Sequence, residues 1–369
     1  MLIEIINYRE ESILDRDKNS ALDNILRSHR ERNHIVIISR DQIKNILKCE
    51  DLSFDARKSL DEIQDSSREY RSLLKELSVI SKVDFSRENE IINSKDGIQD
   101  VILVSYDFFI KSMMIQPTTL ITENDIDHEM YEQITEAYIR SKNELGSLKF
   151  SFQKNCGYGS HTYRVYSDYK SSKKFAFCVV DSDKKHPNAS LGSTAGQFSN
   201  SDFKVSGTVE AKLLSVRELE SLIPIDILEE LLKKGDYHPS SIDTLDKIKE
   251  LNKNSNGEFR KFFDHKDGIT LKDALKPNNM KFWKDFFKNE KNIVIKGCFR
   301  SNICDDCENC IRINGFGDKI LEKSINAMKN INKSKLFKSL PDDIKDEWGF
   351  IGKKAISWGC APAGRKARA

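Results

Sequence analysis

This sequence has little proline and glycine, no long hydrophobic run and a net charge close to zero. No apolar stretch approaches the roughly 20 residues of a membrane-spanning helix, so we expect no membrane partner. With 7 Pro and 17 Gly among 369 residues, a collagen-like or low-complexity chain is excluded, and 38% hydrophobic residues predict a folded protein. Since 60 basic residues face 58 acidic ones, any attraction to nucleic acid must come from local patches.

Two further motifs are missing. The chain starts Met-Leu-Ile-Glu, with Glu4 where a signal peptide needs an apolar segment, so we expect a cytoplasmic protein whose eight cysteines are reduced. No Gly-Lys-Ser/Thr occurs, which leaves a P-loop ATPase unsupported. Any ATPase that works with this chain would be a separate partner protein.

The length exceeds what one hydrophobic core usually organises, and the pattern predicts three regions. Residues 1–116 alternate strand-like runs (2–6, 35–38, 101–104) with helical spacing (21–29, 42–47, 57–77), which indicates an α/β region. Residues 117–225 form the second region. Residues 226–369 are mainly helical and lysine-rich, with helices expected at 227–232, 245–251 and 280–287.

The region 117–225 repeats a unit of strand, polar turn and helix. Strands are expected at 118–122, 148–152, 175–180 and 204–214, and helices at 126–140 and 162–171, with a further helix opening at 217–222. The run 175–180 is apolar on both faces, as a central parallel strand should be. We therefore expect an α/β domain with a mostly parallel, Rossmann-like sheet.

Carboxylates follow two of these strands directly. Glu123 ends the first run, and Asp181-Ser182-Asp183 ends the apolar one. In an open α/β sheet, ligands bind outside the carboxyl ends of the strands, so we expect these carboxylates to share one crevice. An extended Asp-x-Asp turn would project both carboxylates to the same side, where they suit Mg²⁺ and phosphate oxygens. The alternative is an ordinary surface turn.

This ordered set of acidic residues resembles the Toprim domain, the catalytic fold of primases, topoisomerases and several nucleases. The resemblance covers about 110 residues and is greatest to the nuclease branch of OLD-type and related phage-defence proteins, because Arg217 to Pro224 is similar to the start of a helix in that branch. Asn124 stands where Toprim sequences usually have Gly, and Ser221 where the branch has Asn.

The resemblance implies roles for five carboxylates. Glu123 would be a general acid or base or a bridging ligand, and Asp181 and Asp183 would bind one Mg²⁺ or Mn²⁺. Asp127 and Glu220 would complete a second metal site. Two ions about 4 Å apart would activate water and stabilise the leaving oxygen of a phosphodiester. For Asp127, the alternative is a carboxylate that only favours the first turn of its helix.

Four cysteines are clustered near the C-terminal end. Thiols crowded together in a reducing compartment usually bind a metal, and zinc is the first candidate, with an iron–sulfur cluster and unligated thiols as alternatives. The four residues are Cys298, Cys304, Cys307 and Cys310.

Residues 276–300 form a local basic patch with seven Lys or Arg against two acidic residues. Lys284 and Lys288 lie one helical turn apart and are candidates for contacts to phosphate. Phe282, Trp283 and Phe286 interleave with the lysines; they would stack on bases or be the buried face of a helix.

Together these features predict a Mg²⁺-dependent nuclease acting on DNA or RNA, with tRNA as one candidate substrate. The resemblance implies the toxic effector of a prokaryotic antiphage system with a separate ATPase or sensor, and a homo-oligomer is compatible with it. The alternatives are a primase-like Toprim enzyme and a non-catalytic Rossmann-like module that regulates or binds nucleic acid.

Overall fold

The computed structural model describes residues 1–235, 237, 240–287, 301 and 312–363. The chain divides into two compact units that interleave in the sequence. Unit 1 comprises residues 1–179, 198–212 and 349–369, and unit 2 comprises residues 180–197 and 213–348. Each unit is described by itself.

Unit 1 begins with a five-stranded mixed sheet in the order β2-β1-β3-β5-β4. The pairs β1–β2, β1–β3 and β3–β5 are parallel, and the edge strand β4 is antiparallel to β5. The bounds are β1 Leu2–Ile6, β2 Ile35–Ile38, β3 Val79–Asp84, β4 Ile91–Asp96 and β5 Gln99–Ser105.

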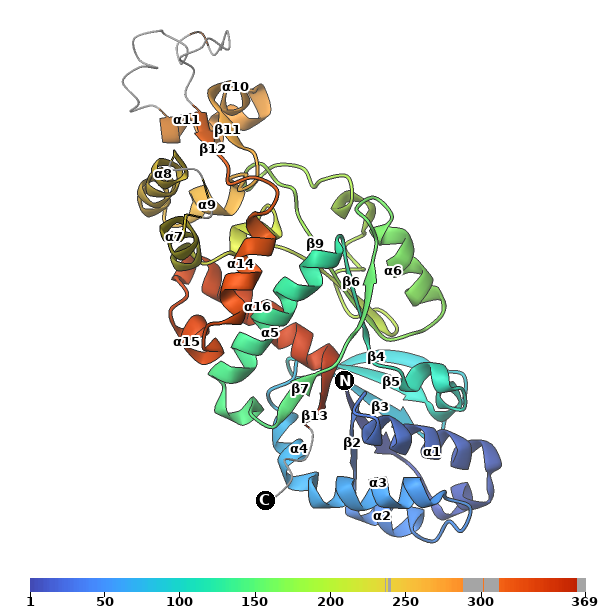
Figure 1. The fold of residues 1–369 in the computed structure, drawn as a ribbon. Coiled ribbons are helices and arrows are strands. Elements are labelled where there is room, and N and C mark those ends of the chain that lie inside the picture. Colours follow the sequence, from blue (N-terminus) through green and yellow to red (C-terminus); the bar gives the residue numbers. More distant parts are fainter. Residues whose placement is uncertain (236, 238–239, 288–300, 302–311, 364–369) are drawn as a thin grey trace. The chain divides into compact units, whose positions relative to one another are not determined.

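Helices cover this sheet, and their start signals are present in the sequence. In α1 (Arg16–Arg30), the Asp15 carboxylate caps the first turn by accepting the N–H groups of Asp17 and Lys18, and the face Leu22, Ile25 and Leu26 is buried. Figure 1 shows α1 beside α3, and both contact β2. The helices are α2 Arg40–Ile46, α3 Phe54–Asp65 and α4 Ser67–Leu73, with short 3-10 turns at Glu10–Leu14, Tyr106–Phe109 and Ser112–Ile115.

The single helix expected over 57–77 is two helices. Helix α3 ends at Asp65 and α4 starts at Ser67, with Ser66 as the residue between them. Serine side chains compete with the backbone for hydrogen bonds and favour helix ends over helix interiors. The apolar spacing that continues across this point therefore did not reveal the break.

A second sheet has the order β10-β9-β6-β8. Strand β6 lies between β9 and β8 and is parallel to both. The bounds are β6 Thr119–Thr122, α5 Asp125–Ser141, β8 Gln153–Cys156, α6 Thr162–Ser171, β9 Ala176–Val180 and β10 Val209–Leu213, with a 3-10 turn at Asn143–Leu145. Every residue of β6 is buried.

The expected strand at 148–152 is not part of this sheet. Residues Leu148–Phe150 form β7, which pairs with β13 (Cys360–Pro362), and the polar segment Gln153–Cys156 pairs with β6 instead. Strand β8 is at the edge of the sheet, where a strand needs no apolar face. The hydrophobic pattern therefore pointed to Leu148–Phe150 instead of Gln153–Cys156 as the strand beside β6.

Unit 2 is mostly helical, as expected for the C-terminal region. Its elements are α7 Ile225–Lys233, α8 Ser240–Asn254, α9 Glu258–Phe262, α10 Leu271–Ala274, α11 Pro277–Phe287, α14 Ile320–Lys329 and α15 Lys333–Lys338, with 3-10 turns at Ala195–Gln197 and Leu219–Leu222 and an antiparallel two-stranded sheet of β11 Gly268–Thr270 and β12 Arg312–Asn314. Helix α16 (Asp342–Gly359) begins in unit 2 and ends in unit 1. The helix expected to open at 217 is only the 3-10 turn at Leu219–Leu222.

The α/β class is therefore confirmed, with one mixed and one largely parallel sheet. Within the described ranges no helix has both the length and the apolar composition needed to cross a bilayer.

Candidate functional site

Glu123 leaves the carboxyl end of β6 on a tightly held backbone. The loop after β8 holds it, because Gly157 N–H donates to the Thr122 carbonyl at 2.9 Å and Gly159 N–H donates to the Glu123 carbonyl at 3.1 Å. The Cys156 thiol donates to the same carbonyl at 3.1 Å. Gly159 has φ +69°, a conformation that glycine adopts without strain. The glycine-containing loop after β8 thus fixes the backbone of the acidic residue.

Asp127 caps the helix that follows. Its Oδ2 accepts the Asn124 N–H at 2.8 Å in the first turn of α5, and the residue is 9% exposed. A carboxylate in this position also favours the N-terminal end of the helix dipole. These contacts support the capping alternative for Asp127, whereas its role as a metal ligand stays a prediction.

Asp181 and Asp183 start unit 2, in the loop after β9. Between them, the buried Ser182 hydroxyl donates to the Val216 carbonyl at 2.6 Å, and Asp183 N–H donates to the Arg217 carbonyl at 2.8 Å. The expectation of an extended Asp-x-Asp turn is wrong: Asp183 has φ +51°, in the left-handed region. The loop is bonded to the segment after β10, and this pairing sets its conformation.

Gly192 closes the same loop against Asp183. Gly192 N–H donates to the Ser182 carbonyl at 3.0 Å. A Cβ added at Gly192 would lie 2.1 Å from Asp183 Oδ2 and 2.4 Å from Asp183 Cβ, so only glycine leaves room for this carboxylate. Asp183 is therefore exposed on one side and held in place on the other.

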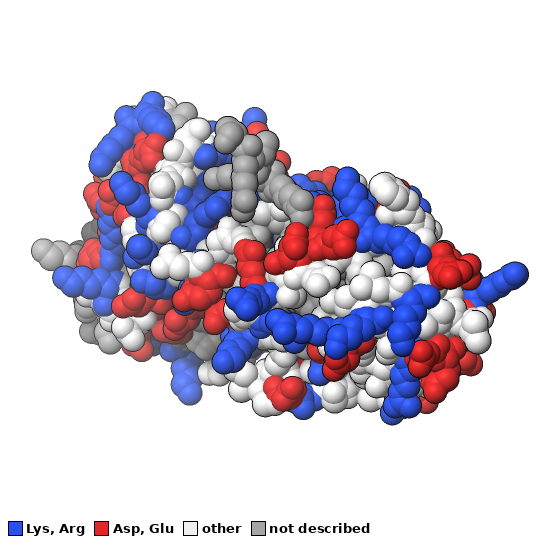
Figure 2. All heavy atoms as spheres, turned by 90° about the horizontal axis from the view of Figure 1, so that it is seen from below, with Lys and Arg blue, Asp and Glu red and all other residues white. Residues whose placement is uncertain are grey.

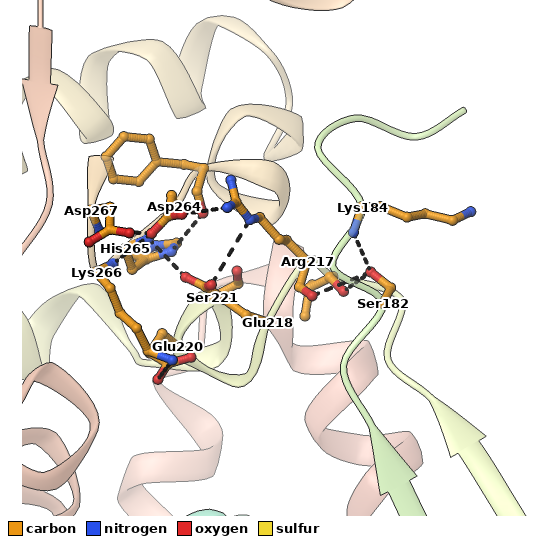
Figure 3. A network of polar contacts seen from close by, with 12 residues as sticks. Ser182, Lys184, Arg217, Glu218, Glu220, Ser221, Asp264, His265, Lys266 and Asp267 are labelled. Carbon is orange, nitrogen blue, oxygen red and sulfur yellow. Dashed lines mark hydrogen bonds and ion pairs between the residues drawn. The ribbon is translucent and has the colours of Figure 1, made fainter. Parts of the chain in front are cut away.

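A network of acidic and basic side chains within unit 2 joins two segments that lie apart in the sequence (Figure 3). The buried Glu220 carboxylate forms an ion pair with Lys266 at 2.8 Å, and Arg217 forms one with Asp264. Glu218 accepts the His265 N–H at 2.9 Å. These contacts join the segment 217–221 to the segment 264–267, which sequence reasoning did not connect.

Charges buried together in this network raise the pKa values of two of its members, Glu218 and Lys266. Burial raises the pKa of Glu218 to about 8, and the negative charges of Glu220 and Asp264 add to the shift. Burial would lower the pKa of Lys266, but Glu220, Glu218 and Asp181 outweigh it and raise that pKa. Asp181 and Glu220, both predicted metal ligands, thus act on the same ammonium group.

No group of three or more His, Cys, Asp or Glu side chains is arranged to hold a metal ion among the described residues. The four clustered cysteines (Cys298, Cys304, Cys307 and Cys310) and Lys288 lie outside the described part of the chain. The described cysteines, Cys49, Cys156, Cys178 and Cys360, are buried free thiols.

The aromatic residues of α11 are packing residues. Trp283 is 1% exposed and Phe287 is fully buried, and the rings of Phe282 and Phe286 lie against Phe262 and Phe259. Of the two interpretations of this helix, the buried aromatic face is confirmed. Lys284 is half-buried on the same helix, and its contact with phosphate stays a prediction.

Charge on the surface is mixed. Figure 2 shows basic and acidic side chains interspersed across one face, in keeping with the formal charge of +2. Local contacts rather than a long-range field would therefore have to bind a charged substrate.

The residues missed by sequence reasoning are Glu218, Asp264 and Lys266. The run Asp264-His265-Lys266-Asp267 follows two buried phenylalanines, so a dense charged segment beside an apolar one was the available signal. Comparison of the chain with protein-family models, with curated proteins and with solved structures found no match.

Proposed function

We propose that this protein is a Mg²⁺-dependent nuclease that hydrolyses phosphodiester bonds in DNA or RNA, with a Toprim-like catalytic region at 117–225. The observation that carries the proposal is the placement of acidic residues: Glu123 directly follows β6, and Asp181 directly follows β9. These two strands are parallel neighbours, paired through Ile121 and Cys178.

The order of the strands adds support. From the carboxyl end of β6 the chain goes on to β8 on one side of the pair, and from the carboxyl end of β9 it goes on to β10 on the other side. Connections thus depart in opposite directions around β6 and β9, and such a point in an open α/β sheet is where ligands bind at the carboxyl ends of the strands. Glu123 and Asp181 directly follow these two strands, which supports the proposal.

The donors suit the proposed ion. Carboxylate oxygens are the preferred ligands of Mg²⁺, and Glu123, Asp181 and Asp183 would supply them. When bound, the ion would polarise the phosphate and lower the pKa of a water molecule. Burial and the charges of Glu220 and Asp264 raise the pKa of Glu218, and Glu220, Glu218 and Asp181 raise the pKa of Lys266 against the effect of burial, so Asp181 belongs to a group of interacting charges in unit 2.

A second ion is not required by this proposal. Asp127 already accepts the Asn124 N–H, and Glu220 is paired with Lys266. One carboxylate oxygen of each residue is thus engaged, Oδ2 of Asp127 and Oε1 of Glu220, and their role as metal ligands stays a prediction. The part as toxic effector of an antiphage system, with a separate ATPase or sensor, rests on the Toprim resemblance.

Cleavage of labelled DNA, tRNA and total RNA with Mg²⁺, Mn²⁺ or EDTA tests the proposal. Glu123→Gln and Asp181→Asn should each lower the metal-dependent rate by about 100-fold or more. Asp168→Asn on α6 and Asp226→Asn on α7, which change exposed carboxylates of the same two units, should keep the wild-type rate. Wild-type protein without activity, or an active Asp181→Asn, would overturn it.

One observation favours a non-catalytic module as the second candidate. Protein cations already neutralise part of the acidic network, since Lys266 binds Glu220 and Arg217 binds Asp264. In such a module the acidic turns would hold a structural ion. EDTA would then lower the melting temperature of the wild type while no nucleic acid is cleaved under any metal condition.

A further inference from the structure

A pocket of about 940 Å³ lies within unit 2, beside the loop that carries Asp183. Its lining includes Asp183, Lys185, His186 and Gly192 from the loop after β9, together with Lys276 just before α11 and Asn279 in its first turn. Its volume is within the range of about 300–1,000 Å³ typical of small-molecule sites. We call it the loop pocket.

The walls of the loop pocket are fixed to each other. The buried Trp283 indole N–H on α11 donates to the Lys185 carbonyl at 2.7 Å, and the His186 ring lies 6.3 Å from the Phe282 ring, centre to centre. On the α11 side, the Asn279 side chain donates to the Asp273 carbonyl at 3.1 Å. The two segments therefore form one preorganised cavity.

The lining carries more positive than negative groups. Two ammonium groups and one imidazole, from Lys185, Lys276 and His186, share the pocket with the single carboxylate of Asp183. Lys276 Nζ also bonds Asp273 at 2.6 Å. Burial would raise the pKa of Asp273, but the bonds from Lys276 and Thr270 and the charges of Lys276 and Lys185 lower it. Both ammonium groups thus act on the Asp273 carboxylate, which Lys276 also binds directly.

The chemistry of the lining fits an anion with several acceptor oxygens. Lysine ammonium groups are common phosphate donors, and amide side chains of Asn188 and Asn278, which also line the pocket, add neutral donors. The first turn of α11, which starts at Pro277, adds a favourable helix dipole.

We propose that the loop pocket binds a phosphate of a single nucleic-acid strand, next to the bond that is cleaved. The inference rests on the proposed function, because Asp183 is both a wall of the pocket and a proposed metal ligand. Lys185 and Lys276 hold the phosphate, and Asp183 faces the neighbouring phosphodiester. The pocket thereby sets the position of the strand relative to the carboxylates.

Binding is measured apart from cleavage. Full-length protein is titrated in EDTA against a fluorescent single strand of about 12 nucleotides, as DNA and as RNA, over about 50–200 mM salt. The double variant Lys185→Glu/Lys276→Glu should weaken binding at least about tenfold and lower the slope of log K against log salt by about 1, since each phosphate contact to a single strand contributes about 0.7.

The matched control is Lys233→Glu/Lys253→Glu, which changes the charge of unit 2 equally at two exposed lysines outside the pocket lining. It should bind like the wild type. The milder Lys185→Gln/Lys276→Gln should bind with intermediate affinity, and it keeps the test valid if the charge reversal impairs folding, which circular dichroism would report.

The outcomes separate the two proposals. Equal binding by the pocket and control variants overturns the loop pocket, even if Mg²⁺-dependent cleavage is found. Selective loss of binding in the pocket variants supports it, and does so even if the wild type cleaves no substrate, in which case only the nuclease proposal fails. Competition by inorganic phosphate in the wild type but not in the pocket variants further supports a phosphate site.

Discussion

Two buried carboxylates, one in each unit, have opposite electrostatics. Asp84 ends β3 in unit 1 and is 3% exposed, whereas Glu218 precedes the 3-10 turn of unit 2 and is 7% exposed. Burial alone would raise the pKa of Asp84, but hydrogen bonds from Asn7 and Ser86 outweigh it and lower that pKa. Burial and two negative neighbours raise the pKa of Glu218 to about 8.

The contrast lies in the supply of donors. Asp84 accepts the Asn7 amide at 2.9 Å and the Ser86 N–H and hydroxyl at 2.9 and 2.7 Å, and Arg87 lies 3.3 Å away. Glu218 accepts one N–H, and Arg217 is 3.9 Å from it. An acidic residue at a strand end thus has a structural role where hydrogen-bond donors surround its carboxylate. The acidic network of unit 2 has fewer donors, so an added cation would interact most favourably there.

The largest effect on stability is expected at Asp84. Asp84→Ala would leave the donors of Asn7, Ser86 and Arg87 without their acceptor and should lower the free energy of unfolding by about 3 kcal/mol. The control Asp96→Ala removes an exposed carboxylate at the end of β4 and should cost less than about 0.5 kcal/mol. Chemical denaturation measures both. If the two variants lower the free energy of unfolding equally, the hydrogen bonds to Asp84 do not stabilise the fold.

The raised pKa of Glu218 predicts that the free energy of unfolding falls as pH rises, the opposite of the pH effect expected from the lowered pKa of Asp84. Because its pKa is raised in the folded state, the folded protein binds the extra proton, and stability is lost as pH rises from the ordinary carboxyl range through about 8. Glu218→Gln keeps an acceptor for the His265 N–H but cannot ionise. At alkaline pH it should be more stable than the wild type by on the order of 2 kcal/mol, with little difference at about pH 5.

Thermal melts across this pH range give the comparison, with Glu250→Gln as an exposed carboxylate control. A Glu218→Gln variant whose stability follows that of the wild type at every pH would show that Glu218 is ionised throughout.

Space around Asp183 gives a third test, on activity. Gly192→Ala would place a Cβ 2.1 Å from Asp183 Oδ2 and displace the carboxylate, whereas Gly196→Ala in the same loop meets nothing within 4 Å. If Asp183 binds the metal, Gly192→Ala should lower the cleavage rate by about tenfold, equivalent to about 1.4 kcal/mol, and Gly196→Ala should not. If both variants keep the wild-type cleavage rate, the position of the Asp183 carboxylate does not affect cleavage.

The smallest effect is expected for Asp181→Asn/Asp183→Asn without metal. Carboxylates that serve only a cation add little to packing, so the free energy of unfolding in EDTA should change by less than about 0.5 kcal/mol or rise. Added Mg²⁺ should stabilise the wild type and not the double variant. A large loss of stability in EDTA would assign these residues a structural role like that of Asp84.

Local sequence determined most of the elements. Strands β1 and β2 and helix α6 have the predicted bounds, because each combines an apolar pattern of one period with flanking polar residues. The position of Glu123 and Asp181 directly after buried strands was also determined locally, since a run of buried residues and the charge that ends it are neighbours in the chain.

Tertiary structure decided the rest. Strand β8, Gln-Lys-Asn-Cys, has no apolar signal, and only its pairing with β6 makes it a strand. The left-handed Asp183 depends on a bond to Arg217, and the ion pair of Glu220 with Lys266 joins residues 46 positions apart. Hydrogen bonds and ion pairs between distant segments leave no periodic trace in the sequence, so the partner of each carboxylate, and with it the pKa of each, was fixed by the fold alone.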